Sequence, residues 1–72
     1  MSDVTTVKLL TSPTELYKIL KFEGLVASGG EAKMVITDGL VSVNGETETR
    51  KRKKIVAGDS IQFNGATLQI TD

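Results

Sequence analysis

Apolar and polar residues alternate near the start of the chain. Val7 and Leu9 stand on either side of Lys8, in a segment from Asp3 to Leu10 that is rich in threonine and valine. This alternation, in residues with branched side chains, is typical of a strand that buries one face. We therefore predict a short strand over residues 3–10.

The next segment has a helical spacing of apolar residues. Leu16, Ile19 and Leu20 lie three and four residues apart and would share one buried face. Gly24 is a natural end for this helix, because glycine enters the left-handed conformation at little cost. A second helix follows, with a buried stripe of Ala32, Val35 and Ile36 and an end at Gly39. Lys33 and Thr37 lie off this stripe and are expected to face outward.

Two capping boxes predict where these helices begin. In the first, Ser12 is the N-cap, Pro13 the first helical residue, and Glu15 stands three residues after the cap. In the second, Ser28 and Glu31 take the same roles. Only a short apolar link separates the two helices, so they must turn sharply against each other.

From residue 40 onward the spacing changes to that of strands. Two Asn-Gly pairs, Asn44–Gly45 and Asn64–Gly65, are strong hairpin signals, because both turn positions need a positive φ. We predict strands around residues 41–43, 46–49, 60–63 and 68–70, with a further turn at Ala57-Gly58-Asp59.

Composition narrows the class of protein. The chain has 72 residues, 39% of them hydrophobic, which suits one small domain spanning residues 1–72. It contains no cysteine and no histidine, so we expect no catalytic residues, no metal site and no cofactor. No apolar run approaches the length of a membrane span, and no signal peptide is evident. We expect a cytoplasmic, monomeric binding module rather than an enzyme.

The positive charge is concentrated in one place. Five of the nine basic residues form what we call the basic cluster: Arg50, Lys51, Arg52, Lys53 and Lys54. Four basic and nine acidic residues remain outside it, which leaves a net charge of −5 on the rest of the chain. The cluster could be a solvated loop or a phosphate-binding loop. The acidic remainder favours a focused anionic partner.

The start of the second predicted helix is another candidate site. Ser28, Gly29 and Gly30 would let a ligand approach the backbone, and the helix dipole favours a phosphate there. Lys33, one turn further on, could add a charge. The alternative is an ordinary capping box with permissive glycines.

The aromatic residues bear on the kind of nucleic acid. Phe63 is expected in the core, and Tyr17 and Phe22 are expected to be packed rather than exposed. Without an aromatic platform, stacking on single-stranded bases should not dominate, so shape and backbone recognition of a folded RNA fits better. Glu46 and Glu48 are expected to be solvent charges rather than an acid–base pair.

These features together resemble the S4-type RNA-binding domain, also called the αL motif. The resemblance runs from about Thr14 to Gln62. Its most specific part is Gly39-Leu40-Val41-Ser42-Val43-Asn44-Gly45 with the later Gly58-Asp59. The Ser28–Lys33 segment looks most like the small stand-alone bacterial YbcJ-like subgroup.

The resemblance implies an α+β fold in which a two-helix αL corner packs on a small antiparallel or mixed β-sheet. It also implies binding of structured RNA, ribosomal or otherwise stable, through Ser28, Gly29, Gly30, Lys33 and Arg50 to Lys54. Many members carry arginine at the position of Gly29, and the basic cluster would compensate here. Three alternatives remain open: a module that docks on an acidic protein, a ubiquitin-like sulfur carrier without its C-terminal Gly-Gly, and a duplex-DNA binder.

Overall fold

A computed structural model describes residues 3–9, 11 and 13–71 of the chain. Its nine elements, in chain order, are β1 (Asp3–Lys8), β2 (Thr14–Glu15), α1 (Leu16–Phe22), α2 (Gly29–Thr37), β3 (Val41–Val43), β4 (Glu46–Thr47), β5 (Lys54–Ile55), β6 (Ser60–Phe63) and β7 (Ala66–Thr71). The α+β class predicted from the sequence is confirmed.

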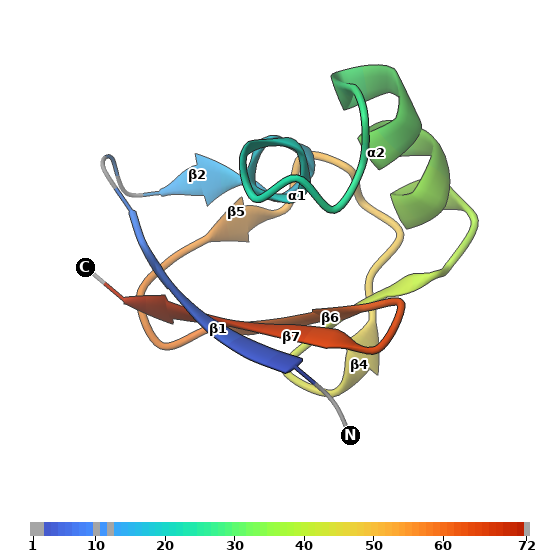
Figure 1. Cartoon of the computed structure of the whole chain (residues 1–72). Helices are drawn as coiled ribbons and strands as arrows, with labels where there is room; N and C mark the ends of the chain where they lie inside the picture. Colours follow the sequence, from blue (N-terminus) through green and yellow to red (C-terminus); the bar gives the residue numbers. More distant parts are fainter. Residues whose placement is uncertain (1–2, 10, 12, 72) are drawn as a thin grey trace.

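The strands form two sheets, with both helices over one face of the larger one (Figure 1). The larger sheet has the order β1-β7-β6-β3-β4, and the smaller one pairs β2 with β5. β1 runs parallel to β7, and the other pairs are antiparallel. The sheet is therefore mixed, and the first strand lies beside the last.

The hydrophobic core lies between the helices and the larger sheet. The helices contribute the predicted stripes, and every one of those residues is buried: Leu16, Ile19, Leu20, Ala32, Val35 and Ile36. The strands contribute alternate residues, among them Val41, Val43, Ile61, Leu68 and Ile70. Because side chains alternate across a strand, the other face of the sheet carries polar residues such as Ser42 and Gln62.

Both helices end as the sequence predicts. Gly24 and Gly39 have φ values of 73° and 79°. In α1, Leu25 N–H donates to Leu20 C=O at 3.1 Å, and Leu40 N–H donates to Val35 C=O at 3.1 Å after α2. These are Schellman bonds, which satisfy carbonyls that the helix leaves unpaired.

The predicted start of the first helix is wrong. Thr14 and Glu15 are in an extended conformation and pair with Ile55 and Lys54, so α1 begins at Leu16 without a side-chain cap. Ser12, the predicted N-cap, lies outside the described residues. The start of α2 is confirmed, because Ser28 Oγ accepts a hydrogen bond from Glu31 N–H at 3.1 Å.

The two Asn-Gly turns are also confirmed, with positive φ at both residues of each pair. The return strand after the first turn is shorter than predicted and ends at Thr47. The first strand ends at Lys8, and Leu10 lies outside the described residues.

Candidate nucleic-acid interface

The basic cluster forms a turn that is anchored on the start of α1. Lys53 N–H donates to Arg50 C=O at 3.1 Å, which closes the turn. The carbonyls of Lys53 and Lys51 then accept from the N–H groups of Leu16 and Tyr17, at 2.9 and 3.2 Å. These amides belong to the first turn of α1 and have no partner within the helix. The cluster backbone therefore replaces a local cap and is held against the start of α1.

Two of the five cations are paired with carboxylates. Glu48 accepts from Nε of Arg50 at 3.0 Å and from Nη2 at 3.2 Å, and also from the Arg50 backbone N–H at 3.0 Å. These side-chain hydrogen bonds hold the pKa of Glu48 below its ordinary value. The same contact raises the pKa of Arg50, whose side chain is 72% exposed. Arg52 Nε lies 3.7 Å from Glu15 Oε2.

The other three cations are available to a ligand. Within the described part of the chain, Lys51, Lys53 and Lys54 form no ion pair. Lys51 and Lys54 are exposed, and Lys53 is half-buried. Lys51 and Lys53 on the anchored turn and Lys54 at the start of β5 are therefore the cations of the cluster without a paired carboxylate.

The start of α2 is a closed capping arrangement. While Ser28 Oγ accepts from Glu31 N–H, Glu31 Oε1 accepts from Ala27 N–H at 2.6 Å. The Glu31 carboxylate therefore occupies the positive end of the helix. Its charge reduces the attraction of this helix end for a phosphate.

The glycines at this helix start leave the surface open. A side chain at Gly29 would lie 3.9 Å from the ring carbons Cδ2 and Cε2 of Tyr17, which is an ordinary contact distance. Gly30 is exposed. Backbone strain does not require glycine here, since neither residue has a positive φ.

Tyr17 contacts both parts of the candidate site, the basic cluster and the start of α2. Its N–H binds Lys51 C=O, and its ring lies beside Gly29. The ring also has Lys33 Nζ 4.8 Å from its centroid, within the range of a cation–π contact. Lys33 is therefore half-buried rather than fully outward-facing as predicted, whereas Thr37 is exposed. The sequence offers no signal for this central position of Tyr17, because the partners that connect the two parts of the site, Lys51, Gly29 and Lys33, are distant along the chain.

The expectation for the aromatic residues is partly wrong. Tyr17 and Phe63 are half-buried and pack against the core. Phe22, the last residue of α1, is 71% exposed. Glu46 and Glu48 were expected to be solvent charges. Glu46 is exposed, as expected, whereas Glu48 binds Arg50.

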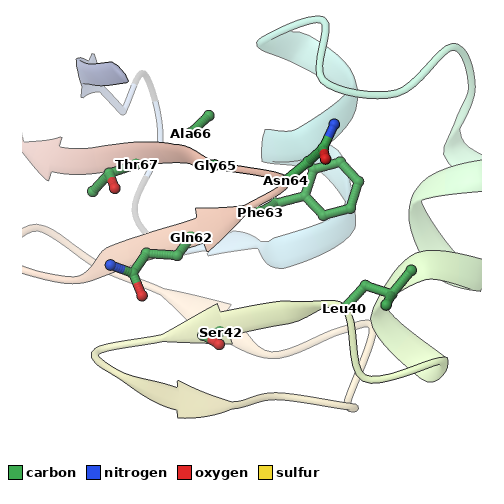
Figure 2. A pocket seen from close by; sticks show the side chains of 8 residues that line it. All are labelled: Leu40, Ser42, Gln62, Phe63, Asn64, Gly65, Ala66 and Thr67. Carbon is green, nitrogen blue, oxygen red and sulfur yellow. The ribbon is translucent and has the colours of Figure 1, made fainter. Parts of the chain in front are cut away.

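A shallow hollow of about 320 Å³ lies at one end of the sheet, around the Asn64–Gly65 turn. Figure 2 shows Leu40, Ser42, Gln62 and Thr67 among its lining residues. All of the residues that line it are uncharged, so it offers no site for a phosphate.

The described ranges 3–9, 11 and 13–71 contain no helix that is long and apolar enough to cross a membrane. The same ranges hold no group of three acidic side chains that could bind a metal ion.

Comparison with known families identifies the fold. The S4 domain family matches residues 7–71. The chain belongs to the S4 domain family. This result favours the resemblance found in the sequence over the ubiquitin-like alternative.

Named relatives of this S4 domain are bacterial proteins. The chain is 50% identical over 56 residues to the Escherichia coli protein named "Putative RNA-binding protein YbcJ", covering 78% of this chain and 80% of that protein. It is 30% identical over 59 residues to the Bacillus subtilis "Probable ribosome maturation protein RlbA", covering 82% of this chain and 83% of that one.

A solved structure supports the same assignment. The solution structure of Escherichia coli YbcJ, described as revealing a motif involved in RNA binding, superposes with a TM-score of 0.74 at 45% identity. The alignment covers all of this chain and 92% of the YbcJ chain. The two-helix corner and its sheet are therefore shared with YbcJ.

Proposed function

We propose that this S4 domain binds structured RNA through one face, formed by Ser28, Gly29, Gly30, Lys33 and the basic cluster. The observation that carries the proposal is the position of Tyr17, which contacts the basic cluster through its backbone and the start of α2 through its ring. The contacts of Tyr17 with both regions, which were predicted separately from the sequence, support one shared face. The RNA-binding descriptions of the YbcJ relatives point the same way.

The charges suggest how this face would hold RNA. Lys51, Lys53 and Lys54 would contact phosphates, because no carboxylate pairs with them among the described residues. Arg50 and Arg52 would contribute after partial release from Glu48 and Glu15. Gly29 and Gly30 would let a backbone approach α2 closely, with Lys33 as an additional cation. Affinity would then depend on shape and phosphate spacing more than on base sequence.

The biological setting is part of the same proposal. We infer a non-catalytic, single-domain, monomeric protein of the cytoplasm that handles ribosomal or another stable RNA. The Bacillus subtilis relative named as a ribosome maturation protein supports this setting. The chain itself offers neither cysteine nor histidine for catalysis.

An NMR titration tests the proposed face directly. Labelled protein would be titrated with an RNA stem-loop and, separately, with a DNA duplex of matched length, each at two salt concentrations. We expect shifts at Ser28–Lys33 and Arg50–Lys54 that are larger with RNA and weaken with salt. Shifts confined to another face, or no response to RNA, would overturn the proposal. A partner that resists nuclease in a pull-down would then point to protein docking.

Substitutions of the unpaired lysines test whether the basic cluster binds RNA phosphates. Replacing Lys51, Lys53 and Lys54 together by glutamine should reduce the salt slope of RNA binding by about 2 to 3, because each phosphate that is no longer neutralised removes about 0.7–0.9 from the slope. The matched control replaces the same three residues by arginine, which keeps the charge and should keep the binding. Amide shifts of Leu16 and Tyr17 would verify that the turn still caps α1. An unchanged slope in the glutamine variant would contradict the assignment.

A further inference from the structure

A groove separate from the proposed phosphate contacts runs between the end of β1 and α1. Its volume is about 470 Å³, within the range of about 300–1,000 Å³ typical of ligand sites. Val7 and Ile19, both buried residues of the core, help to line it. β2 directly precedes α1 in the chain, and the groove lies between α1 and the end of β1. The groove therefore has an apolar lining that belongs to the folded core.

Phe22 lines this groove and is largely exposed to solvent. It is 71% exposed, more than any other large apolar residue in the described chain. An exposed aromatic ring beside buried apolar residues provides a face on which a flat ring can stack.

One lysine of the groove could bind an anion. Lys8, Lys18 and Glu23 all line the groove, and among the described residues Lys8 forms no ion pair. Lys18 Nζ lies 3.4 Å from Glu15 Oε1, and the other oxygen of Glu15 lies 3.7 Å from Arg52 Nε. One carboxylate thus contacts both a groove lysine and a residue of the basic cluster. The groove is therefore adjacent to the surface proposed to hold the RNA backbone.

We propose that this groove holds an unpaired RNA base, stacked on the ring of Phe22, with the phosphate of the same nucleotide near Lys8. The proposal rests on the RNA-binding function argued above and adds a preference for structured RNA that carries a bulged or splayed-out nucleotide. A flat base matches the exposed ring, and its phosphate matches Lys8. An uncharged apolar peptide would match only the ring.

Two RNA ligands separate base stacking from backbone binding. One is a blunt RNA duplex, and the other is the same duplex with a single unpaired adenosine. The wild-type chain should bind the bulged duplex more tightly. Phe22→Ala should lose about 5-fold to 150-fold in affinity for the bulged duplex, the effect of losing one stacked base, and little for the blunt one. Phe22→Tyr should keep the preference.

Control variants test whether the loss of an exposed side chain outside the groove has the same effect on RNA affinity. Leu40 is 58% exposed and lies outside the groove, so Leu40→Ala removes a comparable exposed apolar side chain and should leave both affinities unchanged. Lys8→Gln should lower the salt slope with the bulged duplex by about 0.7–0.9. Lys21 is an exposed lysine of α1 that does not line the groove. Lys21→Gln should therefore lower this salt slope less.

A fluorescent variant reports stacking without relying on affinity. The chain contains no tryptophan, so Phe22→Trp introduces a single indole. Its emission should be quenched by the bulged duplex and much less by the blunt one. A shielded tryptophan in the free protein would contradict the exposed position of residue 22.

The outcomes distinguish this proposal from the function on which it depends. If wild-type protein binds both duplexes equally, or if Phe22→Ala keeps the bulge preference, the stacking site is refuted while RNA binding stands. If neither duplex binds, both proposals fail. Equal loss on both duplexes in Phe22→Ala, with an unchanged melting temperature, would also refute stacking on an unpaired base.

Discussion

The side-chain amide of Asn44 donates a hydrogen bond to Asp59 Oδ1 over 3.0 Å, joining two turns that are 15 residues apart in the chain. The bond is part of a small network. Asn44 Oδ1 accepts from Ser60 N–H at 2.9 Å, and Asp59 Oδ2 accepts from Val56 N–H at 3.0 Å. The most specific part of the family pattern, Asn44–Gly45 with Gly58–Asp59, is therefore a structural clamp. Its residues fix the sheet that supports the two-helix corner.

Removing this clamp should lower stability by a predictable amount. Asn44→Ala places alanine at φ 54° and also removes both side-chain hydrogen bonds. We expect a loss of about 2–4 kcal/mol in the free energy of unfolding, about 1–2 from the left-handed backbone and the rest from the hydrogen bonds. Urea denaturation, followed by circular dichroism, measures this loss.

The second Asn-Gly turn supplies the matched control. Asn64 has a φ of 52°, but within the described part of the chain its side chain forms no such cross-link. Asn64→Ala should therefore lose only the backbone contribution, about 1–2 kcal/mol. Equal losses in the two variants would show that the Asn44 side chain adds nothing.

The features predicted correctly from the sequence are those set by nearby residues. One example is the cap of α2, in which Ser28 Oγ accepts a hydrogen bond from Glu31 N–H. The glycine ends of both helices and the two Asn-Gly turns are further examples. Each of these features involves residues only a few positions apart in the chain. Alternation and helical spacing likewise identify the buried residues, because burial follows directly from the geometry of each element.

The features that were missed depend on contacts between distant parts of the chain. Ser12 and Glu15 fit a capping box as well as Ser28 and Glu31 do, yet Glu15 pairs with Lys54 as a strand, and α1 is capped by carbonyls of the basic cluster. A local pattern cannot reveal that a segment far along the chain will satisfy the same N–H groups.

Acid should weaken one ion pair of the interface. The pKa of Glu48 is lowered in the folded protein, mainly by its side-chain hydrogen bonds to Arg50. A lowered folded-state pKa stabilises the fold above the ordinary carboxyl pKa, and this contribution is lost as pH falls through the folded-state value. Because Arg50 is largely exposed and solvent screens the pair, the effect on the free energy of unfolding should be small.

NMR titration of the Glu48 carboxyl carbon checks this directly. In Arg50→Gln the pKa of Glu48 should return toward its ordinary value. The stability difference between the wild-type chain and Glu48→Gln should be present at neutral pH and shrink in acid. A Glu48 pKa that does not move in Arg50→Gln would contradict the assigned cause.

Adding a cation at Gly29 should strengthen RNA binding. The Cβ of a new side chain would lie no closer than 3.9 Å to Tyr17, and Gly29 has no positive φ, so Gly29→Arg is compatible with the start of α2. Its guanidinium would extend the positive surface on the side of Tyr17 opposite the basic cluster. One added phosphate contact should steepen the salt slope by about 0.7–0.9. Gly29→Ala makes the same backbone change without the charge and should leave the slope unchanged. If Gly29→Arg folds normally but gives the wild-type slope, RNA does not pass over the start of α2, and the binding face is restricted to the basic cluster.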